Sequence, residues 1–290
     1  MKDPDSEDLV IRPASAEEFA TAVQWAANEG WNPGLDDLNA FHLADPSGFL
    51  IGWKGATPIS SISVVRYGPQ FGFIGFYIVH PDHRGAGAGL ATWHAGMKHL
   101  ADRTVGLDGV VDQQDNYRRS GFDYVHANVR YSGTVDLNCA VPADVDIRPL
   151  ERSDVDRVLA FDRAFFPSAR TEFLRAWIDP EAATRRTMLA LRDGSAIGFA
   201  TIRQCQAGFK VGPLFADDRV IAEGLLAAVC DGVPKDSVIS VDVPLPNKSA
   251  VQMVESLGLS PAFETARMYR GPDPELPLER IFGISTFELG

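Results

Sequence analysis

The clearest structural signal in the chain lies between positions 75 and 90. This segment reads Gly75-Phe76-Tyr77-Ile78-Val79-His80-Pro81-Asp82-His83-Arg84-Gly85-Ala86-Gly87-Ala88-Gly89-Leu90. An apolar run ends at Val79, a proline prevents its continuation, and three glycines then alternate with alanines. After them, Leu90, Trp93 and Met97 follow nearly the 3.6-residue period of a helix. The pattern predicts a strand, a glycine loop and a helix.

The glycine loop is typical of an anion site. Alternating glycines let the backbone approach a ligand closely, and the free amides at a helix start carry partial positive charge. A phosphate-bearing ligand is the natural interpretation, although a helix entry without any ligand is the alternative. Two common phosphate motifs are excluded, because Leu90 stands where a dinucleotide loop needs glycine and no Lys-Ser or Lys-Thr follows the glycines.

The spacing Arg84-x-x-Gly87-x-Gly89 after a strand resembles the acetyl-CoA signature of the GNAT superfamily of N-acetyltransferases. The resemblance implies acetyl-CoA as co-substrate, with strand residues Ile78 and Val79 binding the pantetheine and a backbone amide near Ile78 stabilising the oxyanion. The loop residues implied to bind the pyrophosphate are Arg84, Gly85, Ala86, Gly87, Ala88, Gly89 and Leu90.

A tyrosine follows at the position that the same resemblance assigns to a general acid. Tyr117 stands four residues before Gly121-Phe122 and would protonate the leaving thiolate. The alternative is a ring that packs on the sheet. The family's upstream Asn-x-x-Ala is absent from residues 110–116, so the chain departs from the family pattern there.

A weak internal duplication organises the chain. Ile11-Arg12-Pro13 recurs as Ile147-Arg148-Pro149, and Ser120-Gly121-Phe122 is echoed by Leu257-Gly258-Leu259. Between these markers each half shows the order strand, helix, three strands, helix, strand and helix, with Ser15 and Ser153 as expected helix caps. This order predicts an α/β fold with a mixed sheet, built as two tandem GNAT-like domains.

The predicted limits are 1–137 for the acetyl-CoA-binding domain, 145–271 for a degenerate second domain and 272–290 for a tail. The tail carries four large apolar residues close together, so we expect it to dock on a domain or on a second subunit. In the second domain Val254 replaces the acid tyrosine, and Asp217 and Asp218 would repel a pyrophosphate. We therefore expect it to bind no acetyl-CoA, and to shape the acceptor pocket or stabilise the first half.

The acceptor site is less clear. Residues 71–77 contain no carboxylate to serve as a general base, so the base would act through water or come from the loop 29–37. In that loop Trp31 and Asp37 could bind a cationic amine through a ring face and a carboxylate. An ordinary turn anchored by the tryptophan explains the loop equally well.

The charge and residue composition limit the classes of partner that the protein is expected to bind. The 27 Lys and Arg against 39 Asp and Glu leave a net charge of −12, which argues against nucleic acid or membrane as the main partner. Three cysteines without C-x-x-C spacing suit a reducing cytoplasm, and the acidic residues 1–8 do not resemble a signal peptide. The spacing of the histidines does not match a metal site, so we expect no metal ion. We expect the protein to be a monomer or a homodimer.

Together these features predict an acetyl-CoA-dependent N-acetyltransferase. It would transfer the acetyl group to a primary amine of a small molecule by direct attack in a ternary complex. A noncatalytic acyl-CoA-binding or regulatory module is the alternative, and a third possibility places the working site in the second half.

Overall fold

The structure is a computed structural model that describes residues 8–135 and 141–290. The first half contains β1 (Leu9–Pro13), α1 (Ala16–Asn28), α2 (Asp37–Ala44), β2 (Phe49–Lys54), β3 (Thr57–Tyr67), β4 (Phe71–Val79), α3 (Ala88–His99), β5 (Thr104–Val110), α4 (Gln114–Arg119) and β6 (Asp123–Gly133). The second half contains β7 (Val145–Pro149), α5 (Val155–Asp162), α6 (Thr171–Trp177), β8 (Arg185–Arg192), β9 (Ser195–Gln204), β10 (Phe209–Ala216), α7 (Arg219–Cys230), β11 (Ile239–Pro244), α8 (Lys248–Ser256), β12 (Ser260–Arg270) and the tail strand β13 (Ile281–Gly283). Each half follows the predicted order, with one extra helix and one extra closing strand.

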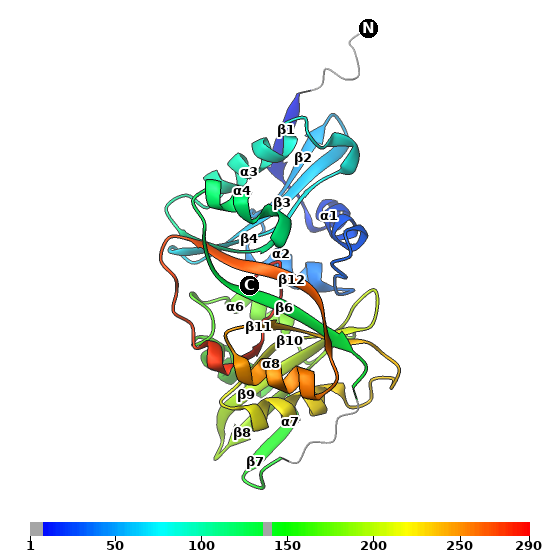
Figure 1. Cartoon of the computed structure of the whole chain (residues 1–290), viewed down its shortest axis with the longest axis vertical. Helices are drawn as coiled ribbons and strands as arrows, with labels where there is room; N and C mark the ends of the chain where they lie inside the picture. The colour runs from blue at the N-terminus through cyan, green and yellow to red at the C-terminus, as the bar shows by residue number, and fades with distance from the viewer. Residues whose placement is uncertain (1–7, 136–140) are drawn as a thin grey trace.

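The strands form one continuous mixed sheet, which confirms the predicted fold class. Its order is β1-β2-β3-β4-β5-β12-β6-β11-β10-β9-β8-β7, and β13 pairs with β10. The pairs β4–β5 and β10–β11 are parallel. Figure 1 shows the two halves one above the other, joined across the middle of the molecule by β6 and β12.

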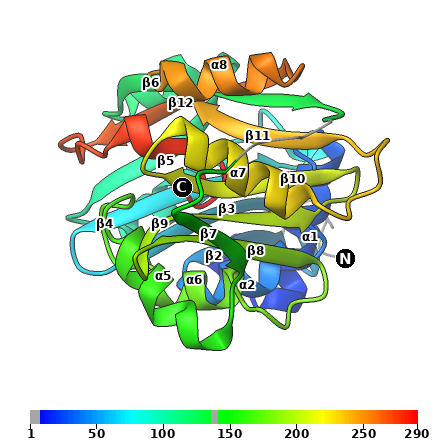
Figure 2. The same cartoon turned by 90° about the horizontal axis from the view of Figure 1, so that it is seen from below.

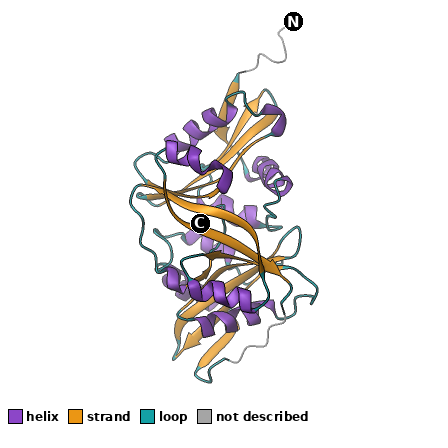
Figure 3. Cartoon of the chain, in the orientation of Figure 1, coloured by secondary structure: helices purple, strands orange, loops and turns teal. Residues whose placement is uncertain are grey.

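The closing strands are exchanged between the halves. β12 of the second half lies between β5 and β6, and β6 of the first half lies between β12 and β11, so both strands cross the centre of the molecule (Figure 3). The register between β6 and β12 shifts at two places, between Pro261 and Phe263 and between Arg267 and Met268. The limits 1–137 and 145–271 stay a prediction, since residues 136–140 lie outside the described part.

The repeated Ile-Arg-Pro motif makes the same contact in each half. Arg12 pairs with Glu18 at 2.7 Å, and Arg148 pairs with Asp154 at 2.7 Å, six residues further along in both cases. Ser15 caps α1 as predicted, because its hydroxyl accepts the Glu18 amide. The expected cap at Ser153 is wrong: a short 3₁₀ turn precedes α5, and its capping box is formed by residues 151 and 154.

The two halves share a core on one face of the sheet. The helices α1, α2, α5 and α6 cover this face, where Phe41 of α2 stacks on Trp177 of α6 with ring centroids 5.7 Å apart. Separate clusters lie on the opposite face, beneath α3 in the first half and beneath α7 and α8 in the second. Figure 2 shows α5 and α6 on one side of the second half and α8 on the other. Residues 281–290 are buried throughout, and Phe287 and Leu289 join the shared core. In the described ranges no helix combines the length and apolar composition needed to span a bilayer.

Candidate active site

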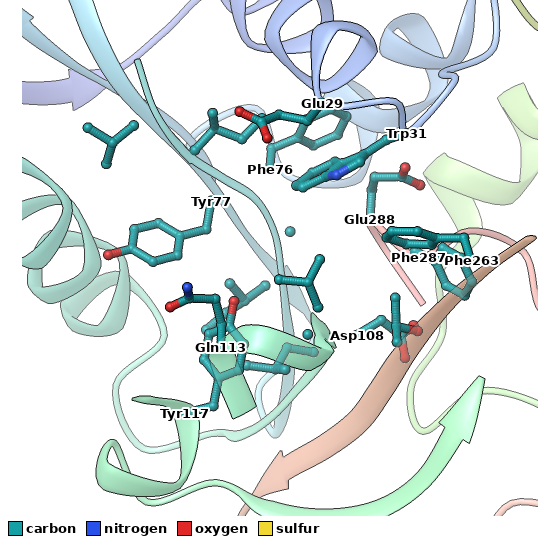
Figure 4. A pocket seen from close by; sticks show the side chains of 18 of the residues that line it. Glu29, Trp31, Phe76, Tyr77, Asp108, Gln113, Tyr117, Phe263, Phe287 and Glu288 are labelled. Atoms are coloured by element: carbon teal, nitrogen blue, oxygen red, sulfur yellow. The ribbon is translucent and has the colours of Figure 1, made fainter. Parts of the chain in front are cut away.

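A cavity opens where β4 and β5 separate. Parallel pairing joins Phe71–Ile74 to Thr104–Leu107 and goes no further among the described residues. Just beyond, Phe76 has a φ of 46°, the register with β3 shifts, and the Ser61 hydroxyl donates to the Phe76 carbonyl at 2.8 Å. Such a bulge bends a strand. A cavity of about 400 Å³ lies between the separated strands (Figure 4).

The edge of β4 that faces this cavity offers unpaired backbone groups. The His80 amide donates to Ile59 on β3 at 2.9 Å. Because successive amides of a strand point to opposite edges, those of Val79 and Tyr77 face the cavity side. The Val79 carbonyl on the same edge accepts from Arg84 Nε at 2.9 Å. Of the amides near Ile78 that could stabilise an oxyanion, those of Val79 and Tyr77 therefore face the cavity, and Ile78 is among the residues that line it.

The glycine loop leads from this edge into α3. Gly85 and Gly87 have φ values of 80° and 85°, and no atom lies within 4 Å of where either Cβ would stand. Backbone amides of residues 85–90 have no hydrogen-bond acceptor within the described part of the chain. Free amides at the positive end of a helix dipole form an anion site. The loop residues lie beside the cavity, whose lining reaches Val79 and Arg84.

Tyr117 of α4 lines the cavity from the β5 side. A Cβ on Gly109 would lie 2.4 Å from Tyr117 Cε2, so the ring reaches this place only because β5 has a glycine there. Its other face packs on Trp93, with ring centroids 5.7 Å apart. Loss of hydration, and to a smaller extent the neighbouring Tyr77, raises the pKa of Tyr117. The hydroxyl therefore keeps its proton at neutral pH.

Three carboxylates line the cavity, and two of them are already paired. Glu29 pairs with Arg84. Asp108 accepts two hydrogen bonds from Arg267, at 2.8 and 2.7 Å, and a third from an asparagine of β6. Glu288 has neither an ion pair nor a side-chain hydrogen bond among the described residues. Within those residues no group of three or more His, Cys, Asp or Glu side chains could hold a metal ion.

The second half builds one wall of the cavity. Shaping the acceptor pocket was one of the two roles expected of this half, but the residues that form the wall were not predicted. β12 supplies Phe263 and Thr265, and the tail supplies Phe287 and Glu288. Figure 4 shows Phe263, Phe287 and Glu288 together on the side opposite Tyr77 and Tyr117. The alternation along β12 and the apolar run of the tail were the available signals, but neither indicates which half these segments join.

The two predicted acceptor residues lie in different places. Trp31 lines the cavity, and its carbonyl accepts from Arg130 at 3.1 Å and from Lys210 at 2.8 Å. Asp37 is buried outside the lining, where it accepts from Arg203 Nε at 3.2 Å. The structure thus brings Trp31 to the cavity but not Asp37.

The equivalent place in the second half is filled by the tail. β10 pairs with β11 only over residues 209–211 and 239–241. Beyond this point β13 pairs with β10, opposite Leu214 and Phe215, and Ile284 donates its amide to Asp242 of β11 at 2.9 Å. The tail therefore occupies the space between the separating strands, which in the first half is the open cavity.

Comparison with known proteins places both halves in one family. Residues 16–122 match the family described as Acetyltransferase (GNAT) family, and residues 158–283 match the one described as Acetyltransferase (GNAT) domain. The chain is 31% identical over 279 residues to holothin acyltransferase of Pseudoalteromonas sp. (strain SANK 73390), spanning 96% of this chain and 94% of that protein.

Solved structures resemble the whole chain in fold. A putative acetyltransferase from Pyrococcus horikoshii superimposes with a TM-score of 0.81 at 19% identity, covering 97% of this chain and 96% of that one. A tandem GNAT protein from the clavulanic acid biosynthesis pathway gives a TM-score of 0.65 at 17% identity, with 92% and 100% covered.

Proposed function

The chain belongs to the GNAT family of acyltransferases as a tandem member, and from this we propose that its first half transfers the acetyl group of acetyl-CoA to a primary amine of a small molecule. The observation that carries the proposal is the cavity between β4 and β5, which has free loop amides at one end and Tyr117 on its wall. The reaction is a direct attack of the amine on the thioester in a ternary complex.

The loop and the strand edge suit the two ends of the coenzyme. The unpartnered amides of residues 85–90 would bind the pyrophosphate. The free edge of β4 would hold the pantetheine, which brings the thioester to the bulge at Phe76. The Arg84 side chain pairs with Glu29 and donates to the Val79 carbonyl, so it holds the start of the glycine loop against the end of β4.

The chemistry at this point requires few groups. The amine nitrogen attacks the thioester carbon, and the Tyr77 amide, which faces the cavity edge, would stabilise the developing oxyanion. As the carbon–sulfur bond breaks, Tyr117 donates its proton to the thiolate. The raised pKa of Tyr117 ensures that this proton is present.

The cavity walls favour an amine with an aromatic or apolar body. The rings of Trp31, Phe76, Phe263 and Phe287 surround the space next to the bulge. Aromatic walls stabilise planar groups by stacking and amines by cation–π contact. Holothin, the substrate named for the curated relative, is therefore a first acceptor to test.

The test is release of free CoA from acetyl-CoA in the presence of an amine panel. The panel contains holothin, 2-phenylethylamine, aniline and a polyamine, and products are identified by mass. We expect turnover with at least one amine, and a fall in kcat of about 10²-fold or more in Tyr117→Phe. Binding of acetyl-CoA without turnover on any acceptor, and no effect of Tyr117→Phe, would instead indicate a noncatalytic acyl-CoA-binding module.

A further inference from the structure

We propose that Glu288, contributed by the tail of the second half, accepts the proton that an alkylammonium acceptor must lose before it attacks. This inference rests on the proposed function. It assigns a general base, for which β4 itself has no carboxylate. An alkylamine has a pKa near 10.4, so at neutral pH it reaches the cavity mostly as the ammonium, which has no lone pair for attack.

Glu288 lies against β4 at the place where the thioester would react. A Cβ on Gly75 would stand 2.1 Å from the Glu288 carbonyl oxygen and 2.9 Å from its Cα, so only a glycine admits the tail there. Gly75 immediately precedes the bulge residue Phe76 and stands two residues before Tyr77, whose amide faces the cavity. The tail thus delivers a carboxylate to a strand that has none.

The tail is held firmly on both sides of Glu288. The Leu289 amide donates to the Thr286 hydroxyl at 2.9 Å, and the Leu289 carbonyl accepts from Tyr67 at 3.2 Å. The Phe287 ring lies 4.9 Å beneath the Arg130 guanidinium. These contacts fix the backbone that carries Glu288, which favours a defined position for its side chain.

Glu288 is the carboxylate of the cavity that no cation in the described ranges neutralises by direct contact. It is only 6% exposed, and a side chain buried to this degree normally has a polar partner. Arg130 of β6, Arg203 of β9 and Lys210 of β10 act on it electrostatically at longer range. Trp31 and Glu288 lie next to each other in the lining of the cavity (Figure 4), so an ammonium group bound there would supply the missing partner.

The proton balance of the reaction follows from these positions. The ammonium gives one proton to Glu288, which passes it to solvent after the product leaves. The nitrogen then forms the bond to the carbonyl carbon, the carbon–sulfur bond breaks, and Tyr117 protonates the sulfur. The nitrogen loses its second proton to solvent. Tyr117 then regains from solvent the proton that it gave to the sulfur.

The experiment compares two acceptors in wild type, Glu288→Gln and Glu288→Asp. One acceptor is the alkylamine of the panel that wild type acetylates fastest, such as 2-phenylethylamine. The other is the aromatic amine acetylated fastest, such as aniline, which is neutral at pH 7 and needs no base before attack. Glu279→Gln is the matched control, since Glu279 lies on the same tail but is exposed, and thermal melting reports whether each variant is folded.

We expect Glu288→Gln to lose about 10²-fold or more in kcat/KM for the alkylamine and less than tenfold for the aromatic amine, with acetyl-CoA binding unchanged. Raising the pH should narrow the alkylamine deficit, because the free amine becomes more abundant, and Glu288→Asp should restore part of the rate. Equal losses for both acceptors at every pH, or an alkylamine rate within threefold of wild type, would overturn this inference alone. Absence of turnover by wild type on every amine would contradict the proposed function itself.

Discussion

Arg130 and Asp242 form a buried two-point ion pair between the halves, with Nε–Oδ1 and Nη2–Oδ2 distances of 2.7 and 2.9 Å. Arg130 lies on the exchanged strand β6 and Asp242 on β11. Its counterpart joins Arg267 of the other exchanged strand, β12, to Asp108 of β5, at 2.8 and 2.7 Å. Each exchanged strand is thus anchored by the same arginine–aspartate contact, which repeats the internal duplication in three dimensions.

Asp242→Asn should destabilise the protein strongly. The substitution keeps the shape but leaves the Arg130 guanidinium buried without its counter-charge, and breaking a buried pair in this way costs about 3–5 kcal/mol. Urea unfolding should show the loss in the free energy of unfolding. Glu181→Gln, which removes an exposed pair with Arg152, is the control and should change little. Equal, small effects in both variants would show that the buried pair does not hold the exchanged strand.

The sequence indicated most of the elements but not their pairing. The strand before the glycine loop, the helix after it and the Ser15 cap all have local signals, because they depend on residues within a few positions of each other. The exchange of β6 and β12 depends on contacts between residues more than 100 positions apart, such as Arg130 with Asp242. No local pattern distinguishes a strand that returns to its own half from one that crosses.

Gly87→Val should remove acetyl-CoA binding. Gly87 has a φ of 85°, which a β-branched residue rarely adopts, so valine should change the backbone of the loop whose free amides would bind the pyrophosphate. We expect the Kd for acetyl-CoA to rise at least tenfold in calorimetric titration. Gly194→Val is the matched control, because Gly194 has a φ of 76° in equally open space but belongs to a hairpin of the second half. A similar change in both variants would point to general unfolding and away from a specific site.

The chain should bind one acetyl-CoA and not two. In the second half β13 fills the space between β10 and β11. Asp218 also caps α7 by accepting the Ile221 amide at 3.0 Å, so a carboxylate already occupies the start of the helix where a pyrophosphate would bind. Titration of wild type should therefore give one site per chain. Two equivalent sites in wild type, or one site of wild-type affinity remaining in Gly87→Val, would place the coenzyme in the second half as well.

The candidate site was predictable on the coenzyme side and not on the acceptor side. Arg84, the loop glycines and Tyr117 lie in continuous motifs of the first half, so their spacing alone brought them together. Glu288 is brought to Gly75 only by the path of the tail across both halves. Asp37 had the right chemistry, but burial beside Arg203 engages it elsewhere.

Stability should fall as the pH drops from about 6.5 to about 4, and His126 should account for part of the fall. His126 of β6 is buried and faces the charge of Arg267, and the loss of hydration together with that charge lowers its pKa to about 4. Between its unfolded pKa near 6.5 and this folded value, the unfolded chain binds a proton that the folded protein does not, so acid favours unfolding by on the order of 3 kcal/mol. His126→Gln should flatten the pH dependence of the unfolding free energy in this window, whereas His94→Gln, at an exposed position of α3, should leave it as in wild type. An unchanged slope in His126→Gln would show that other groups, and not this histidine, govern stability there.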